Sequence, residues 1–219
     1  MSLADRDGVI WLDGELVQWR DARVHVLTHT FHYGLGVFEG VRAYATVRGP
    51  LIFRLYEHTD RLFRSAHILG FPMPFEKEAL NEAQRTVVRE NGLREAYIRP
   101  MCFYGSEEMG LRAENLNPHC MIAAWEWPNY LTPEARIQGI KGKTSSYTRH
   151  HVNANLQRAK IIGHYVNSIL ARYEANDNGF DEAIMLDNLG YVAEGTGENL
   201  FVARDGVVKT PPTVNILAG

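Results

Sequence analysis

Two prolines interrupt the chain near its middle, in the segment Glu126–Pro133, between one strand-like run and the next. Proline lacks a backbone N–H and ends regular structure, so such a segment is typical of a boundary between domains. We therefore predict an N-terminal domain over residues 1–127, a linker over 128–137 and a C-terminal domain over 138–219. With 45% hydrophobic residues, the 219-residue chain can build a sizeable core.

The first part of the chain mixes strand and helix signals. Val9–Leu12 and Leu16–Val17 surround the turn dipeptide Asp13-Gly14, which is the signature of a β-hairpin. Apolar residues at helical spacing, followed by residues that stop a helix, predict two helices. These helices span residues 57–69 and 80–88, and further strands are expected over 37–44, 51–55, 96–103 and 120–125. The pattern predicts an α+β fold.

The second part contains one strong helix signal, which Asn178-Gly179 ends. Six apolar or aromatic residues recur there at helical spacing, namely Ile162, Tyr165, Val166, Ile169, Leu170 and Tyr173. Short strands are expected after it, over residues 182–186, 191–193, 199–203 and 207–209.

Charge and composition narrow the classes of partner. The formal net charge of −3 leaves no basic field that would gather nucleic acid or anionic lipid, so a small molecule is the better expectation. Asp5, Arg6 and Asp7 stand where a secretion signal needs an apolar core, and no apolar run is long enough to span a bilayer. We expect a cytoplasmic protein with neither nucleic acid nor membrane as partner. Cys102 and Cys120 lie in apolar runs, which favours buried free thiols.

The histidines raise the question of a metal site, because His25, His29 and His32 have a spacing that suits one face of a helix. The alternating valines and threonines of Val24–Thr30 favour an extended strand instead, on which His32 would point away from the other two. We therefore expect no metal. The adjacent pair His150-His151 is interpreted as part of a solvated loop.

Two groups of glycines resemble a dinucleotide-binding loop, one at Gly34, Gly36 and Gly40 and the other at Gly195 and Gly197. Neither group completes the pattern, and the second lies between two strands and not before a helix. Tight turns explain these glycines equally well, so a Rossmann dehydrogenase is not expected.

Lys160 and Glu194 are the candidates for chemistry. Most lysines are solvated, but Lys160 stands between apolar residues, which disfavours its charged form and would free the amine to form a Schiff base. Glu194 leaves a strand among glycines, and it is either an ordinary turn acid or the partner of a pyridine nitrogen in a pyridoxal enzyme. In such an enzyme Tyr165 would contact the ring hydroxyl and Arg61 the phosphate.

Arg99 ends an apolar strand, where an unpaired guanidinium would be costly to bury. Its partner is either an internal acid or the distal carboxylate of a dicarboxylic substrate such as glutamate.

Several segments resemble the fold-type IV branched-chain amino acid aminotransferases, in order and in spacing along the whole chain. The most specific is Glu194–Phe201, and the others are Asp21–Val26, His32–Gly34, Val37–Arg42, Tyr97–Pro100 and Ala159-Lys160 with Tyr165. The resemblance implies a pyridoxal 5'-phosphate enzyme that moves amino groups between leucine, isoleucine or valine and 2-oxoglutarate.

The same resemblance assigns roles to residues. Lys160 would hold the cofactor and move the proton at the substrate Cα, and Glu194 would partner the pyridine nitrogen. Arg61, Tyr165 and Leu217 would bind the remaining cofactor groups. Arg99 would pair with the distal carboxylate of glutamate. The rest of the substrate pocket would be apolar and aromatic, formed by Tyr33, Phe38, Tyr97, Met109, Trp127 and Tyr130.

The resemblance also implies a small α+β N-terminal domain, a barrel-like C-terminal domain, and a homodimer or larger homo-oligomer whose sites borrow loops from the neighbour. Thr210–Gly219 resembles the family's approach to a phosphate-binding turn, so the C-terminal domain is expected to be incomplete here. Relatives with other activities leave alternatives open: a D-amino acid or R-amine transaminase, an aminodeoxychorismate lyase, or a catalytically silent truncated member.

Overall fold

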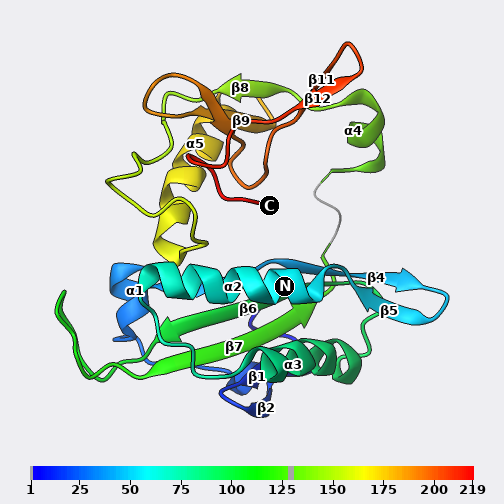
Figure 1. Ribbon diagram of the computed structural model, residues 1–219. Coiled ribbons are helices and arrows are strands. Elements are labelled where there is room, and N and C mark those ends of the chain that lie inside the picture. Colours follow the sequence, from blue (N-terminus) through cyan, green and yellow to red (C-terminus); the bar gives the residue numbers. More distant parts are fainter. Residues whose placement is uncertain (1, 128–130) are drawn as a thin grey trace. The chain divides into compact units, whose positions relative to one another are not determined.

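The computed structural model describes residues 2–127 and 131–219 (Figure 1). The chain divides into two compact units, Met1–Pro128 with Ile161–Gly163, and Asn129–Lys160 with His164–Gly219. Both mix helices and strands, so the α+β prediction is confirmed. A short helix, α4 (Pro133–Gln138), lies within the range that the sequence predicted as a linker.

The first unit is built on a seven-stranded sheet in the order β2-β1-β7-β6-β4-β5, with β3 paired to β6. Every pairing in it is antiparallel. Its strands are β1 (Val9–Leu12), β2 (Glu15–Gln18), β3 (Gly36–Phe38), β4 (Val41–Thr46), β5 (Gly49–Ile52), β6 (Ala96–Tyr104) and β7 (Pro118–Trp125). Strands β6 and β7 are the longest, and they pair along their length from Tyr97–Trp125 to Tyr104–Pro118.

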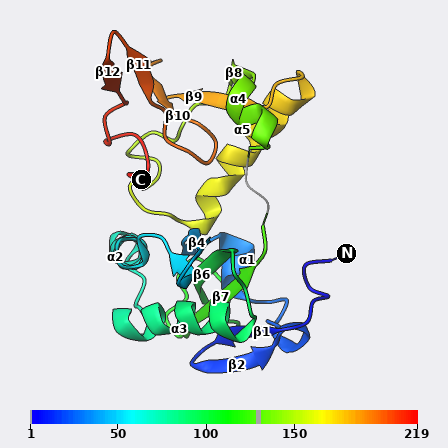
Figure 2. The ribbon, with the colours of Figure 1, turned by 90° about the vertical axis from the view of Figure 1, so that its right-hand side faces the viewer.

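Helices α2 (Leu55–Leu69) and α3 (Lys77–Glu90) pack against each other and cover one face of this sheet (Figure 2). Their inner faces carry Leu62 and Leu80, both fully buried, as the helical spacing predicted. Helix α2 ends at Gly70, whose positive φ lets its N–H reach back to the carbonyl of Ala66. A 3-10 turn, η1 (Trp19–Asp21), follows β2.

The extended strand predicted over Val24–Thr30 is wrong, because a short helix, α1 (His29–Tyr33), forms there. The Thr28 hydroxyl donates to the carbonyl of His25 at 2.6 Å and closes a turn before the helix. Gly34 then adopts a φ of 69° and ends the helix as a left-handed cap. Among the residues that the structure describes, no three His, Cys, Asp or Glu side chains gather in a way that could hold a metal ion.

Strand β3 lies so close to its neighbours that only glycine fits at one position. A Cβ at Gly36 would stand 2.8 Å from the carbonyl oxygen of Cys102. Ile161 forms a β-bridge with Val37, and the N–H of Gly163 donates to the Gly34 carbonyl at 3.1 Å. The three residues that follow Lys160 are therefore held by the first unit.

The second unit has a smaller framework. Helix α5 (Tyr165–Asp177), entered through the 3-10 turn η2 (Ile162–His164), packs against a three-stranded sheet in the order β10-β9-β8. The strands are β8 (Gly142–Thr144), β9 (Glu182–Leu186) and β10 (Val192–Glu194), and a separate hairpin joins β11 (Val202–Arg204) to β12 (Val207–Lys209). In the part of the unit that is described, these strands form no closed barrel.

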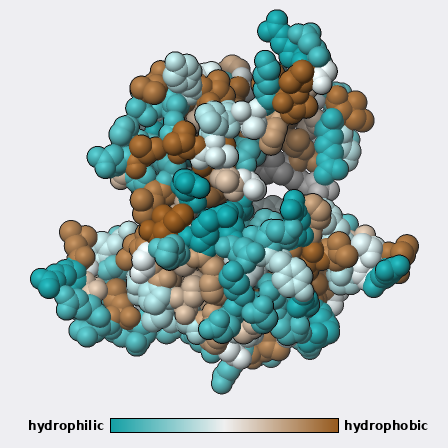
Figure 3. Space-filling view, in the orientation of Figure 1, coloured by the Kyte–Doolittle hydropathy of each residue, from teal (hydrophilic) through white to brown (hydrophobic). Residues whose placement is uncertain are grey.

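The core of the second unit consists of small side chains, Ala171, Ala175 and Ala183, around one fully buried methionine, Met185. Alanines allow α5 to approach β9 closely. The larger apolar residues of α5, whose spacing predicted the helix, instead face outward, with exposed fractions of 61% for Val166 and 63% for Tyr173. In the space-filling view, apolar side chains accordingly appear on the surface of this unit (Figure 3).

Cys102 and Cys120 are free and buried, as expected from the sequence. They face each other across strands β6 and β7, with 3.1 Å between their sulfur atoms. Over the described ranges, no helix combines the length and the apolar character that crossing a membrane requires.

Candidate active site

Lys160 and Tyr165 form a polar pair at the entrance to helix α5. The Lys160 side chain is half-buried behind the fully buried Ala159, and its Nζ lies 2.5 Å from the Tyr165 hydroxyl. Tyr165 is the first residue of α5, so the helix fixes the position of the phenol. An amine and a phenol at this distance share a hydrogen bond along which a proton can move.

Glu194 ends strand β10 and is 6% exposed. One of its oxygens, Oε1, lies 2.8 Å from Nε of Arg149. The other, Oε2, accepts two long hydrogen bonds, from the Leu217 N–H at 3.3 Å and from the Asn199 amide at 3.4 Å. Burial raises the pKa of Glu194, and the neighbouring charge of Arg149 opposes that rise.

Arg149 ties the Glu194 loop to helix α5. Its Nη2 donates to the carbonyl of Gly195 at 2.7 Å, and its Nη1 donates to the Ser168 hydroxyl at 2.8 Å. The residue is buried, although it lies in a segment without any regular strand or helix. The sequence did not predict a role for Arg149, because its neighbours show no apolar periodicity. The one indication was that a buried Glu194 would need a positively charged partner.

The prediction of a solvated loop at His150-His151 holds for His151 but not for His150. His151 is exposed, but His150 is half-buried and its ring lies 5.6 Å from that of the buried His164. Burial and the nearby Arg149 lower the pKa of His150, and burial lowers that of His164 to about 4. Both rings are therefore neutral at physiological pH.

The loop after Glu194 is a tight turn, as its glycines predicted. The Gly195 N–H donates to the Glu198 carbonyl at 2.8 Å, and a Cβ at Gly195 would stand 3.1 Å from the Glu198 side chain. The hydroxyl of Thr196 donates to Glu182 at 2.6 Å, which fastens the loop to strand β9. Burial and a hydrogen bond with Glu182 raise the pKa of Glu198 to about 7.

A second cluster of predicted site residues lies on the sheet of the first unit, around Arg99 of strand β6. Its Nη2 donates to the Tyr97 hydroxyl at 2.8 Å, and its guanidinium carbon lies 4.7 Å from the centre of the Phe38 ring. Within the described residues, the buried Nε of Arg99 has no hydrogen-bond partner. No internal salt bridge of Arg99 is found in the described part of the chain, and its Nε retains the capacity to donate to an anion.

Aromatic rings extend this cluster. The Tyr97 ring lies 4.8 Å from that of Trp127 and 5.1 Å from that of Trp125. Gly40 permits the arrangement, because a Cβ there would stand 2.4 Å from the Tyr97 hydroxyl. Phe38, Tyr97, Arg99 and Trp127 thus lie together, whereas Tyr130 lies outside the described residues. Their role in a substrate pocket stays a prediction.

Arg61 of helix α2 is held by an acid. Its Nε lies 2.6 Å and its Nη2 2.8 Å from the two oxygens of Glu39, which is fully buried and also contacts the His58 ring at 2.9 Å. This bidentate pairing fixes the plane of the guanidinium. The phosphate contact that the sequence assigned to Arg61 stays a prediction.

Tyr33 and Met109 share a different corner of the first unit. The Tyr33 ring lies 4.5 Å from that of His29, whose Nε2 lies 3.0 Å from the carbonyl oxygen of Gly110, beside Met109. Both Tyr33 and Met109 are exposed.

Comparisons with known proteins show the family to which this chain belongs. Residues 36–219 match the family described as amino-transferase class IV. The chain is 63% identical to a branched-chain-amino-acid aminotransferase of Pseudomonas aeruginosa over all 219 residues, and it spans 71% of that protein's length. A crystal structure of the Escherichia coli branched-chain amino acid aminotransferase matches 98% of this chain and 71% of its own with a TM-score of 0.95, at 44% identity. A crystal structure of a branched-chain amino acid aminotransferase from T.th. with pyridoxamine 5'-phosphate matches 98% of this chain and 70% of its own with a TM-score of 0.93, at 46% identity.

Proposed function

Because this chain belongs to the class IV aminotransferase family, we propose that it transfers the amino group between a branched-chain L-amino acid and 2-oxoglutarate. The proposed cofactor is pyridoxal 5'-phosphate. Support comes from relatives that carry this activity in their names, and from the chemistry of the two clusters described above.

The cofactor fits the residues around Lys160. Glu194 offers a buried carboxylate whose Oε2 receives only long contacts, so it retains capacity for a strong hydrogen bond from a ring N–H. The Tyr165 hydroxyl suits a phenolic oxygen, and Arg61 suits a phosphate. When bound, pyridoxal phosphate withdraws electrons from the bond between the substrate Cα and its hydrogen, which makes that proton removable.

In this proposal Lys160 Nζ holds the cofactor before the reaction and then moves the proton at the substrate Cα. The hydrogen bond from Nζ to the Tyr165 hydroxyl orients the amine. Only a neutral amine can accept a proton, so the base in this proposal is the uncharged form of Lys160.

Arg149 acts in the proposal as a positioning residue for Glu194. A buried glutamate tends to become neutral, and a neutral carboxyl could no longer keep a pyridine nitrogen protonated. The positive charge of Arg149, 2.8 Å away, favours the ionised form of Glu194. Its hydrogen bonds to Gly195 and Ser168 hold the same carboxylate in place.

The choice of substrates rests on one observation, the half-buried Arg99 side chain inside an aromatic cluster, whose buried Nε has no hydrogen-bond partner among the described residues. A dicarboxylic substrate supplies the missing anion, and bidentate pairing with a carboxylate suits an arginine. Phe38, Tyr97 and Trp127 offer apolar ring faces to a branched side chain when the other substrate is bound. One site could thereby accept two chemically different side chains.

We further propose that the protein is a homodimer. Tyr33 and Met109 were expected to line the substrate pocket, and both lie at an exposed corner of the first unit around His29 and Gly110. Phe31 and Leu111 add exposed apolar surface beside them. Such a corner suits a contact through which each subunit contributes residues to its neighbour's site. Light scattering of the purified protein tests this, and a strictly monomeric mass for an active protein would refute it.

The function is tested by incubating the purified protein, with added pyridoxal phosphate, with 2-oxoglutarate and a panel of amino donors. We expect turnover with leucine, isoleucine and valine, and little with D-leucine or 1-phenylethylamine. Preference for the D-amino acid or the amine would assign another activity of the same family. Cofactor binding without any amino transfer, but with cleavage of an amino-chorismate, would assign the lyase reaction.

A further inference from the structure

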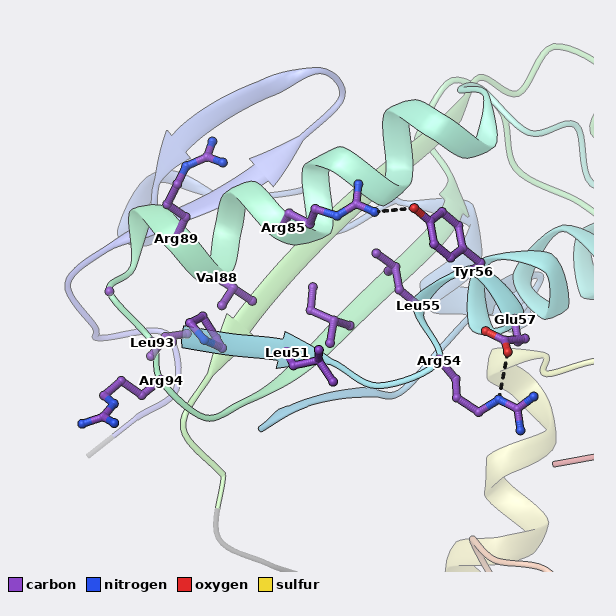
Figure 4. Close-up of a pocket in the computed structure, with 13 residues that line it drawn as sticks. Leu51, Arg54, Leu55, Tyr56, Glu57, Arg85, Val88, Arg89, Leu93 and Arg94 are labelled. Atoms are coloured by element: carbon purple, nitrogen blue, oxygen red, sulfur yellow. Dashed lines mark hydrogen bonds and ion pairs between the residues drawn. The ribbon is translucent and has the colours of Figure 1, made fainter. Parts of the chain in front are cut away.

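A groove in the first unit lies apart from all the residues discussed above. It runs between strand β5, the start of α2 and the C-terminal half of α3 (Figure 4) and has a volume of about 760 Å³. Sites for small molecules range from about 300 to 1,000 Å³, so the groove has the size of a ligand site.

The floor of the groove is apolar. Leu51 of β5, Leu55 of α2 and Val88 of α3 line its centre, and Leu93, which follows α3, lies at one end (Figure 4). Leu55 and Val88 are buried in the core, whereas 56% of Leu51 is exposed although it lies over them. A ligand with an apolar body would cover this surface and gain the free energy of removing it from water.

The rim of the groove is positively charged. Four arginines line it, Arg54, Arg85, Arg89 and Arg94, and Glu57 is the one acid among the lining residues, all of which lie in the described part of the chain. Glu57 pairs with Arg54 at 3.0 Å, and two acids outside the lining pair with arginines of α3, Glu82 with Arg85 at 3.4 Å and Glu90 with Arg89 at 3.1 Å. Four arginines against these three acids leave a small excess of positive charge. Because the whole chain carries a net charge of −3, this excess of positive charge is a local feature and not a general one. It favours an anion.

One part of the rim is already ordered. Arg85 donates from Nη2 to the Tyr56 hydroxyl at 2.9 Å, and its guanidinium carbon lies 5.6 Å from the centre of the same ring. Figure 4 shows this pair at one edge of the apolar floor, with Arg54 at the same end. A head group bound there would meet a fixed guanidinium and a phenol, which reduces the entropy lost on binding.

We propose that this groove binds a small organic anion, with an aliphatic or aromatic body on the leucine and valine floor and a carboxylate or phosphate head beside Arg85. This site goes beyond the proposed amino transfer and uses none of its residues. A free amino acid fits poorly, because its ammonium group would stand among the arginines next to its carboxylate. A neutral lipid alcohol fits the floor but offers the rim no charge.

Calorimetric titration of the purified protein with decanoate, decyl phosphate and decanol, all below micelle-forming concentrations, tests the proposal. We expect one molecule of at least one of the anions to bind per chain, and decanol to bind about tenfold more weakly or not at all, since a charged hydrogen bond is lost. Comparison of the two anions identifies the head group. Equal binding of decanol and both anions, or no binding at all, would overturn the proposal.

Three variants locate the site. Arg85→Ala should weaken anion binding about tenfold, and Leu51→Glu should abolish it, because it places a negative charge on the floor. Arg48→Ala, at an exposed arginine outside the lining residues, should bind like the unmodified protein. Thermal melting checks that each variant is folded, and light scattering records its size. Unchanged anion binding in both groove variants would refute the site, and dissociation of an oligomer by Leu51→Glu would assign the groove to a subunit contact instead.

Discussion

The two units hold their functional side chains in place by different means. In the first unit, large side chains such as Leu62, Leu80, Ile98 and Ile122 are fully buried between a seven-stranded sheet and two helices. The second unit buries alanines around Met185 and leaves larger apolar residues exposed. A core of large side chains stabilises a fold far more than one of alanines, since the stabilisation follows the apolar area removed from water.

Ion pairs and hydrogen bonds link the elements of the second unit. Arg149 and Glu194 form a buried pair, whereas Glu174 is half-buried and accepts from Lys143 at 2.8 Å and from the Ser145 hydroxyl at 2.5 Å. We propose a division of roles, in which the first unit recognises the substrate and the second holds the charged groups that transfer protons. The following predictions test that division.

The largest effect is expected for Lys160→Ala. Removal of the amine eliminates the proposed base, and a general base alone contributes about a hundredfold to ten-thousandfold to a rate. Amino transfer should fall by at least that factor, and the visible absorption of the bound cofactor should change. Lys141→Ala, at an exposed lysine of the same unit, is the matched control and should keep full activity. Undiminished turnover of the Lys160 variant would remove this residue from the mechanism.

Arg149→Met tests whether ion pairing supports the second unit. The change leaves the buried Glu194 without its cation, and breaking a buried pair by removing one partner costs about 3–5 kcal/mol. Denaturant unfolding should show this loss. The double variant with Glu194→Gln should recover much of the stability, because no uncompensated charge remains, but not the activity. A single Arg149 variant as stable as the unmodified protein would show that packing alone holds this unit.

The two cores are compared directly by Leu62→Ala and Ile169→Ala. Leu62 is fully buried in the first unit, so its truncation should destabilise the protein by about 2–5 kcal/mol. Ile169 is exposed on α5, so its truncation should change stability by no more than about 0.5 kcal/mol. Denaturant midpoints measure both. A large loss for Ile169→Ala would mean that the outward face of α5 is covered in solution.

The sequence predicted those features that arise from periodicity and local turn chemistry. The positions of α2, α3 and most strands follow from apolar spacing, and the glycines around Glu194 do form a tight turn. The cluster of Phe38, Tyr97 and Arg99 was predictable because cross-strand pairing of β3 with β6 brings nearby positions of the two strands together.

What the sequence could not predict depends on distant partners. The apolar spacing of α5 indicated a helix correctly but not which face is buried, since Ala171 and Ala175 pack against β9 in place of Val166 and Tyr173. Arg149 escaped notice because its partner lies 45 residues further along the chain. The helix at His29–Tyr33 was not predicted for two reasons. Gly34 ends it after five residues, and the alternation of residues before it is typical of a strand.

A smaller effect is expected for Arg99→Ala, which tests recognition by the first unit. Loss of a charged hydrogen bond costs about 1.5–3 kcal/mol, or about ten- to a hundredfold. The kcat/KM should fall by this factor for glutamate and 2-oxoglutarate and much less for leucine, which has no second carboxylate. Arg48→Ala, at an exposed arginine of the same unit, serves as the comparison. Equal losses for both classes of substrate would contradict the role of Arg99.

The smallest effect is a pH dependence in the second unit, centred on Glu198. Its carboxyl shares a hydrogen bond with Glu182 of β9, near Arg172 of α5, and its pKa is raised from 4.5 to about 7. Below about 4.5 the group is protonated in both the folded and the unfolded protein, so its hydrogen bond stabilises the fold fully. As the pH rises through 7, the folded state must ionise a second carboxylate beside Glu182, and that stability is lost.

Denaturant unfolding of the unmodified protein and of Glu198→Gln, from about pH 5 to about pH 8, isolates this contribution. Glutamine keeps a donor for Glu182 at every pH, so the variant should gain stability relative to the unmodified protein as the pH rises. We expect a gain of about 1 kcal/mol, because the exposure of Glu198 to solvent screens the repulsion between the two carboxylates. His164 changes the stability in the opposite direction, because its lowered pKa of about 4 makes folding more favourable as the pH rises toward 6.5. This contribution is the same in both proteins and cancels in the difference. Glu134→Gln, an exposed acid on α4, should show no such shift. A flat difference for Glu198→Gln would mean that this carboxyl is already ionised in the folded protein, and that Arg172 alone compensates both acids.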